Sequence, residues 1–550
     1  MALRKSITRV LVWLLLIGLP ATIGSTSAGP SDAAVVRSAE RGDPVQTGAR
    51  LERSGRWVEA IEHYERALKQ WPDNEHLRYG LRRSKVHFGI DRRYSDRSFE
   101  TALLPMSRAA ALDRFDEVLY QVKTNFVDPV SITSFVAHGT ESLYLALAND
   151  KFSSMHLGRV NADRVGRLRT ILRDQYWNKA IAHRLAARET VGEICDLAAA
   201  TIGLPAGAVV MEYIFGGCYS LDEYSAFLTP DRLSDLYGNI DGEFVGLGIE
   251  MKAEPGRGLA LVNVLPDSPA AAGGLKRGDF IVAIEGADSR EMTTDEGAKL
   301  LRGPSGSSVR LRFQRGESGP LYDGTFFRRS VHVKSVPVAK IVDRENGVAY
   351  VQMTGFQRTT PQELDEALLA LQRQGMRALI WDLRGNPGGL LPIAAEVTDR
   401  FIGDGLLVST RGRQTSQNDT WTARRAGTWT VPLVLLVDRD SASASEIVAG
   451  AIRDHRRGTI VGRTTYGKWT VQTILPLSDR KLGLRLTTAK FYSPSGQCLS
   501  HVGVAPDVVV DLSGERQTGY RGVTGLEAGD DADVDRGLEV LRRQLRVGLN

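Results

Sequence analysis

An apolar run that leads into two acids and three serines constrains the fold more than any other stretch of the chain. Residues 431–437 (VPLVLLV) are rich in Val and Leu without alternation, which predicts a buried strand. From Glu446 onward, apolar residues recur at helical spacing. Residues 438–445 (DRDSASAS) therefore form a tight turn that lifts a serine to a helix N-terminus. There, free N–H groups and the helix dipole stabilise negative charge.

The serines have a simple structural interpretation and a functional one. Capping explains one of the three, because Ser and Asp are common N-cap residues. It does not explain the Ser-Ala alternation or the downstream residues 467–472 (GKWTVQ). Together these blocks resemble the carboxy-terminal processing proteases, a Ser-Lys peptidase family in which the base follows the nucleophile by the 25 residues that separate Ser443 from Lys468. Gln472 and Asp454 also stand at family positions.

Lys468 can act as the base only when it is neutral, and a free lysine titrates near 10.4. Burial among apolar neighbours lowers the lysine pKa. Gln472 carries an amide that would hold the amine in line without adding charge. A carboxylate would keep the ammonium charged, so Asp454 is interpreted as structural. The neighbours expected to bury the lysine are Tyr466, Trp469, Val471 and Ile474.

The tetrahedral intermediate of peptide hydrolysis needs backbone donors for its oxyanion. The N–H of Ala444 is the first candidate, because it follows the nucleophile at the helix N-terminus. The family resemblance implies a second donor in the loop 386–389 (NPGG), and we favour Gly388. Asp382 and Arg384, which precede this loop, are interpreted as scaffolding.

A Ser-His-Asp triad is the competing mechanism. His455 is the histidine nearest to Ser443 in sequence, but it lies 12 residues further along the same predicted helix. That spacing places it about 18 Å away at the helical rise per residue. His501 is the other candidate, because its position in the fold is not set by the sequence. The lysine is therefore the preferred base.

Two residues depart from the family pattern, which usually has glycine at both positions. Asp440 precedes the first serine, where a left-handed backbone that Asp tolerates would preserve the turn. Trp469 follows the lysine, where its ring would line or partly block the active-site tunnel. Both departures concern rate and substrate range more than the class of reaction.

Residues 241–335 resemble a PDZ domain. Their first block matches the loop that receives the C-terminal carboxylate of a peptide, where glycines let backbone N–H groups approach an anion closely. The strand that follows would accept a peptide by β-augmentation. The predicted peptide-binding residues are Phe244, Val245, Gly246, Leu247, Gly248 and Ile249.

The N-terminal part of the chain is predicted to be an export signal followed by helices. Residues 1–28 combine a basic start, an apolar run and small residues for cleavage, and 29–40 form a linker. Residues 41–94 carry one tetratricopeptide (TPR)-like pattern, which favours a helical hairpin or an adaptor-binding surface equally. Residues 95–240 form a helical domain that supports the rest.

Alternating strands and helices in residues 336–512 predict an α/β peptidase core, which the family resemblance makes crotonase-like. The tail 513–550 contains a short helix over 534–545 and no chemical signal. The fold class is thus multidomain α+β. The three cysteines (Cys195, Cys218, Cys498) form no Cys-x-x-Cys pair, and a Cys195–Cys218 disulfide and buried free thiols are both open. No pattern calls for a metal or cofactor.

These observations predict an exported Ser-Lys endopeptidase of the periplasm or cell envelope. Its PDZ domain would recognise C-terminal segments of protein substrates and feed them to Ser443. A net charge of +5 over 550 residues, without a basic run, makes no case for a nucleic-acid partner, and we expect none. An uncleaved N-terminus would instead hold the protein at the membrane. The alternatives are a catalytically idle PDZ/TPR peptide-binding scaffold and, less favoured, a crotonase-like acyl-CoA enzyme.

Overall fold

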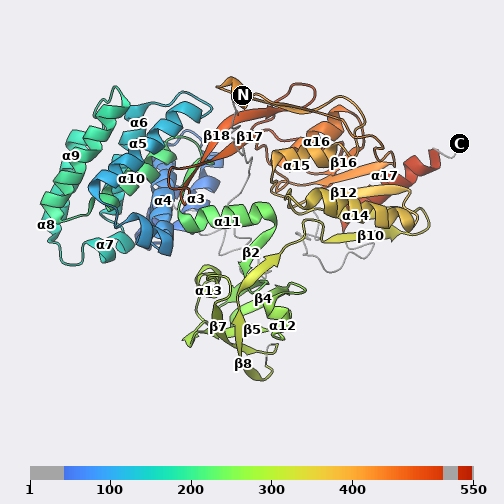
Figure 1. The fold of residues 1–550 in the computed structure, drawn as a ribbon, viewed down its shortest axis with the longest axis horizontal. Helices are drawn as coiled ribbons and strands as arrows, with labels where there is room; N and C mark the ends of the chain where they lie inside the picture. The colour runs from blue at the N-terminus through green and yellow to red at the C-terminus, as the bar shows by residue number, and fades with distance from the viewer. Residues whose placement is uncertain (1–42, 317, 512–530, 548–550) are drawn as a thin grey trace, which may run out of the picture.

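The computed structural model describes residues 43–316, 318–511 and 531–547. Figure 1 shows a helical region, a small β-rich lobe that projects from the molecule, and an α/β region. The predicted signal segment and linker lie outside the described residues. Across the part of the chain that is described, no helix combines the length and apolar character needed to cross a membrane.

The helical region begins with α2 (Pro44–Arg53), α3 (Trp57–Gln70) and α4 (Glu75–Arg93). Tyr64 of α3 is buried between the other two helices, where a Cβ on Gly48 or on Gly80 would overlap its ring. Close packing at these glycines fits the expected helical unit, while its TPR-like character stays a prediction.

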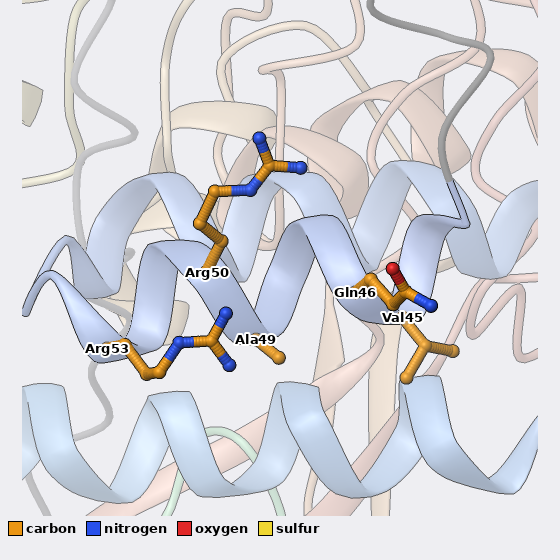
Figure 2. Close-up of a pocket in the computed structure, with 5 residues that line it drawn as sticks. All are labelled: Val45, Gln46, Ala49, Arg50 and Arg53. Carbon is orange, nitrogen blue, oxygen red and sulfur yellow. The ribbon is translucent and has the colours of Figure 1, made fainter.

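A hollow of about 480 Å³ lies on α2, and the described residues that line it all belong to that helix. Figure 2 shows the two arginines that make it basic. None of the predicted catalytic or peptide-binding residues belongs to it. The lining residues are Val45, Gln46, Ala49, Arg50 and Arg53.

The remaining helices of this region enclose one large hydrophobic core. Ser107, Ser131 and Asn149 cap three of them by accepting the backbone N–H three residues ahead. Cys195 and Cys218 are buried as free thiols, which decides against the disulfide alternative. The elements are η1 (Phe99–Leu103), α5 (Arg108–Asn125), α6 (Ile132–Ala146), α7 (Asp150–His156), α8 (Ala162–Ile171), η2 (Leu172–Tyr176), α9 (Arg184–Ile202) and α10 (Ala206–Tyr219).

A short strand joins the helical region to the α/β region. β1 (Ala226–Leu228) pairs antiparallel with β18 (Gly483–Tyr492). Four leucines of residues 477–486 belong to the same hydrophobic core as the helices. The two regions are therefore packed as one body. After β1, α11 (Pro230–Asp241) leads into the lobe.

A two-stranded neck connects the lobe to the rest of the protein. In this neck, β2 (Glu243–Gly246) pairs antiparallel with β9 (Arg329–His332). Its own sheet has the order β3-β4-β5-β7-β8, so β3 is an edge strand, as β-augmentation requires. Its hydrophobic core contains residues of the lobe alone. The other elements are β3 (Ile249–Glu254), β4 (Gly258–Val264), α12 (Pro269–Ala272), β5 (Phe280–Ile284), β6 (Ala287–Asp288), α13 (Thr294–Leu301), β7 (Ser308–Gln314) and β8 (Leu321–Phe327).

The α/β region is built on a six-stranded sheet of order β10-β11-β12-β15-β16-β19, parallel except for the first pair. β15, Leu433–Val437, is buried at every position because helices cover both faces of the sheet. The likeness to crotonases stays a prediction. The other elements are β10 (Val338–Asp343), β11 (Val348–Gln352), α14 (Thr360–Arg373), β12 (Ala378–Asp382), α15 (Leu391–Thr398), α16 (Ala444–Asp454), β16 (Thr459–Gly462) and β19 (Val508–Val509).

A second sheet of this region carries a long hairpin, in which β17 (Thr470–Pro476) pairs antiparallel with β18. β18 also pairs with β13 (Leu406–Gly412), which continues through η3 (Thr415–Gln417) to β14 (Thr420–Thr422). β17 begins two residues after Lys468. The hairpin thus links the lysine to the helical region through β1.

The tail returns to the sheet as α17 (Ala532–Val547), two residues longer at each end than predicted. Val534, Leu538 and Leu541 pack it on the sheet face opposite α16. Figure 1 shows this red helix against the strands of the α/β region.

Candidate functional site

Ser443 lies where β15 turns into α16, at the place that the strand-turn-helix pattern predicts. Its φ of 61° and ψ of −107° are unusual for a residue with a side chain and cost about 1–3 kcal/mol. The side chain is fully buried, and its Oγ has no hydrogen-bond partner within the described residues. Asp438 holds the turn, because its Oδ1 accepts the N–H groups of Asp440 and Ser441.

Glu446 ties the serine turn to the lysine loop. Its Oε2 accepts the N–H of Ser443 at 2.7 Å and the N–H of Lys468 at 2.8 Å. Its Oε1 accepts the hydroxyl of Thr465 and the N–H of Gly467, both at 2.7 Å. Burial raises the pKa of this carboxyl, although its donors act in the opposite direction. Because one oxygen bonds both backbones, Ser443 and Lys468 are close neighbours in space.

Lys468 is buried, with 2% of its surface exposed. Burial, helped by the positive charge of Arg485, lowers its pKa to about 7. The centroid of the Tyr224 ring lies 4.1 Å from its Nζ. Of the four expected neighbours, three are buried and Tyr466 is 48% exposed. The burial of Lys468 agrees with the expectation from the sequence, while the ring that lies at its Nζ is that of Tyr224, which was not among the four.

Gln472 lies on β17 and is buried. Its Nε2 donates to the hydroxyls of Thr470 and Thr487, at 3.0 and 3.1 Å. These bonds orient the amide, and its Oε1 has no hydrogen-bond partner in the described part of the chain. The site therefore holds a second buried acceptor besides the Oγ of Ser443.

The two predicted oxyanion donors differ in availability. Ala444 is the first residue of α16, so its N–H has no acceptor within the helix. The backbone of Gly388 lies against this turn, since a Cβ on it would be 3.1 Å from the Ala444 nitrogen. However, the Gly388 N–H donates to Asn386 Oδ1 at 2.9 Å. Gly388 thus lies beside Ser443, but its N–H is already hydrogen-bonded, and its role as an oxyanion donor stays a prediction.

An ion-pair network braces the loop that contains Gly388. Arg384 bonds Asp382 at 2.7 Å and also bonds Asp531 and Asp533, each at 2.8 Å. Arg463 shares Asp533. The two aspartates from the tail lie at the start of α17. Asp382 and Arg384 are scaffolding as expected, but the tail is part of the same scaffold.

The residues weighed against the lysine mechanism lie elsewhere. His455 is the C-cap of α16, and its Nε2 is 2.7 Å from the carbonyl of Leu406. His501 has its backbone beside Gly467, but its side chain is exposed. Asp454 accepts the N–H of Ser495 at 2.9 Å, which agrees with a structural role.

At both positions that depart from the family pattern, Asp440 and Trp469, the structure differs from our expectation. Asp440 has no left-handed backbone, and Ser443 takes the positive φ instead. Trp469 is fully buried and stacks on Phe491, with ring centroids 4.6 Å apart. Its Nε1 donates to Glu446 at 3.3 Å. The expectation that this ring lines a tunnel is therefore wrong, because it is core.

The predicted peptide-binding loop joins β2 to β3. Phe244, Val245 and Gly246 form β2, and Ile249 begins β3. Leu247 is buried in the core of the lobe, so its side chain is not a binding surface. Gly248 has a φ of 77°, and a Cβ there would overlap Ser268. In the described chain, the N–H groups of residues 247 and 248 donate no hydrogen bond, which leaves them available to a carboxylate.

Several residues that contact the Ser443 turn, Lys468 or the loop of Gly388 were not predicted from the sequence. Glu446 is the third residue of the helix that follows Ser443, and the S-x-x-E capping pattern could have revealed it. Arg485 and Asp533 carry no such local signal, because they reach the site from distant parts of the chain. Tyr224 lies in residues 222–230 (DEYSAFLTP), which resemble a segment of the protease family, but that resemblance indicated only a structural role.

The comparisons with known proteins agree with this geometry. A profile of peptidase family S41 matches residues 347–510, and a PDZ domain profile matches residues 262–315. A carboxy-terminal-processing protease of Bartonella bacilliformis is 39% identical over 316 residues, which cover 56% of this chain and 71% of that protein. A carboxyl-terminal-processing protease of Synechocystis is 34% identical over 296 residues, covering 53% and 69%.

Proposed function

Because the chain belongs to the carboxy-terminal processing protease family, we propose that it is an endopeptidase with Ser443 as nucleophile and Lys468 as general base. The observation that carries this proposal is the position of Glu446, which holds a strained, buried serine beside a buried lysine. A lysine with a pKa of about 7 is half neutral at neutral pH, as a general base must be.

The proposed reaction runs in two steps. Neutral Lys468 takes the proton from Ser443 Oγ while that oxygen bonds to the peptide carbonyl carbon. The lysine then gives the proton to the leaving amine as the C–N bond breaks, which leaves an acyl-serine. A water molecule, deprotonated by the same lysine, attacks this ester. The lysine then gives the proton to Ser443 Oγ as the ester C–O bond breaks, which releases the new carboxyl end and restores the serine.

Two further groups support these steps. The unpaired Oε1 of Gln472 would accept a hydrogen bond from the lysine amine and hold it in line, which removes an unsatisfied buried acceptor. The N–H of Ala444 would stabilise the oxyanion. Gly388 would be the second donor once the substrate oxygen displaced the amide of Asn386.

The lobe is the proposed substrate-recognition element. The free N–H groups of residues 247 and 248 would bind the C-terminal carboxylate of a protein substrate, and the open edge of β3 would pair with its last residues. We also propose export to the periplasm or cell envelope through residues 1–28, with an adaptor at α2–α4 as a further partner.

The test is cleavage of an unfolded protein by wild type, Ser443→Ala and Lys468→Ala between pH 6 and 10. Wild type should cleave with a rate that rises through about pH 7, and both variants should be inactive but folded. Lys481→Ala, at an exposed lysine of the β17–β18 turn, is the matched control and should cleave like wild type. If wild type cleaves nothing but binds peptides with a free C-terminus, the scaffold alternative replaces the proposal.

A further inference from the structure

The amine of Lys468 is covered by a residue from a different region of the chain. The Tyr224 ring lies over Nζ, with 4.1 Å between the nitrogen and the ring centroid. Tyr224 stands in the connection between α10 and β1, at the end of the helical region. Among the described residues, no side-chain acceptor forms a hydrogen bond with this Nζ. The Tyr224 ring is therefore the side-chain contact on which we base the argument about the Lys468 amine.

The position of Tyr224 is fixed by the backbone around it. Arg485 Nε donates to the Tyr224 carbonyl at 2.9 Å. The next residue, Ser225, accepts the N–H of Thr487 through its Oγ at 3.1 Å. β1 then pairs with β18, beginning with Ala226 opposite Arg485. Tyr224 is thus attached to the hairpin whose other strand starts just after Lys468.

We infer that Tyr224 is a positioning residue for Lys468, and that its ring is the wall that keeps water from the amine. The inference rests on the proposed function of the lysine, and it means that the helical region completes the site of the base. A phenol ring also attracts an ammonium group, but by less than the solvation that the excluded water would provide. Opening this wall should therefore favour the charged amine.

The other charged groups around the amine do not replace this wall. Arg485 on β18 disfavours the charged lysine. Asp222 and Glu223, next to Tyr224, and Glu446 on α16 favour it. Tyr466 also lies near Tyr224 but is exposed. A test must therefore change the ring and leave these charges intact.

The first test compares the pH profiles of peptide cleavage by wild type, Tyr224→Phe and Tyr224→Ser. Phe keeps the ring and should retain the midpoint near 7. Ser admits water and should raise the midpoint by about one unit or more, which lowers the rate at pH 7 by about fivefold or more. The rate should recover at pH 9 to 10. A rate that falls equally at every pH, with an unmoved midpoint, would overturn the inference.

The second test does not depend on activity. The ¹³C resonance of Lys468, assigned with Lys468→Ala, is titrated in wild type and in Tyr224→Ser protein labelled at lysine. The Ser variant should titrate at higher pH than wild type. If it does while no form cleaves a substrate, the inference stands and the proposed function fails. Titration at the wild-type pH or below it overturns the inference. Tyr224→Thr serves in both tests if the Ser variant does not fold.

Discussion

The helical region and the lobe are both attached to the α/β region, but in different ways. The helices share one hydrophobic core with the leucines of the β17–β18 hairpin, and β1 extends the same sheet. The lobe has a core of its own and hangs from the β2–β9 neck. An ion pair between Arg302 of the lobe and Asp235 of α11 spans 3.8 Å between exposed side chains.

This difference separates two tasks. The helical region contributes Tyr224 to the surroundings of Lys468, so its fixed attachment preserves the geometry of the proposed catalytic groups. Among the described residues, the groups that act on the Lys468 amine come from outside the lobe, whose attachment through the β2–β9 neck is separate from them. We therefore expect the two regions to respond differently to mutation, to pH and to deletion.

The largest effect should come from the shared core. Phe227→Ala removes a fully buried ring from β1 and should lower the free energy of unfolding by about 3–5 kcal/mol, with loss of activity. Calorimetry should show the transition of the helical and α/β regions shifted and that of the lobe unchanged. Ile281 is equally buried in the lobe. Ile281→Ala should therefore shift the transition of the lobe and leave that of the helical and α/β regions unchanged. One transition shifted by both variants would refute the separation.

The next effect concerns the ion pairs that Arg384 and Arg463 form with Asp531 and Asp533 at α17, which we call the brace at α17. Asp533→Ala leaves Arg384 and Arg463 short of a buried partner, and should cost about 3 kcal/mol of stability and lower kcat. Denaturant unfolding and initial rates measure the two quantities. Glu539→Gln, on the exposed face of the same helix, is the control and should change neither. An unchanged kcat in Asp533→Ala would show that the brace does not reach the site.

A smaller effect is the dependence of stability on pH. Folded Lys468 loses its proton near pH 7, whereas an unfolded lysine keeps its proton to about 10.4. Between these values the unfolded chain binds more protons, so this residue makes stability rise with pH, by about 1 kcal/mol from pH 7 to 8. Lys468→Met should remove this slope from the transition of the helical and α/β regions, and Lys481→Met should keep it.

The smallest effect on stability should follow removal of the lobe. Gly246 pairs with Arg329, so residues 247–328 can be replaced by an Asn-Gly turn between β2 and β9. The free energy of unfolding of the remaining protein should change by less than about 1 kcal/mol, since no hydrophobic core is cut. Preference for a free substrate C-terminus, measured with amidated and free peptides, should disappear. A large loss of stability would contradict the independence of the lobe.

The sequence predicted those parts of the site that depend on short segments. Ser443 at a helix start and β15 as a buried strand follow from apolar spacing within about twenty residues. The environment of Lys468 does not, because Tyr224 reaches it through strand pairing between β1 and β18. The burial of Trp469 also depends on tertiary packing, which local spacing does not reveal. The bond from the Gly388 N–H to Asn386 is local, and the tendency of Asn to bond the backbone two residues ahead could have indicated it.

The brace at α17 has a consequence for the order in which the protease matures. Asp531 and Asp533 follow Ser443 and Lys468 in the chain, so the ribosome adds them after both reactive groups. A chain that ends before residue 531 would contain Ser443 and Lys468 while the loop beside Ser443 lacked these ion pairs. These ion pairs can therefore form only after both Ser443 and Lys468 have been synthesised.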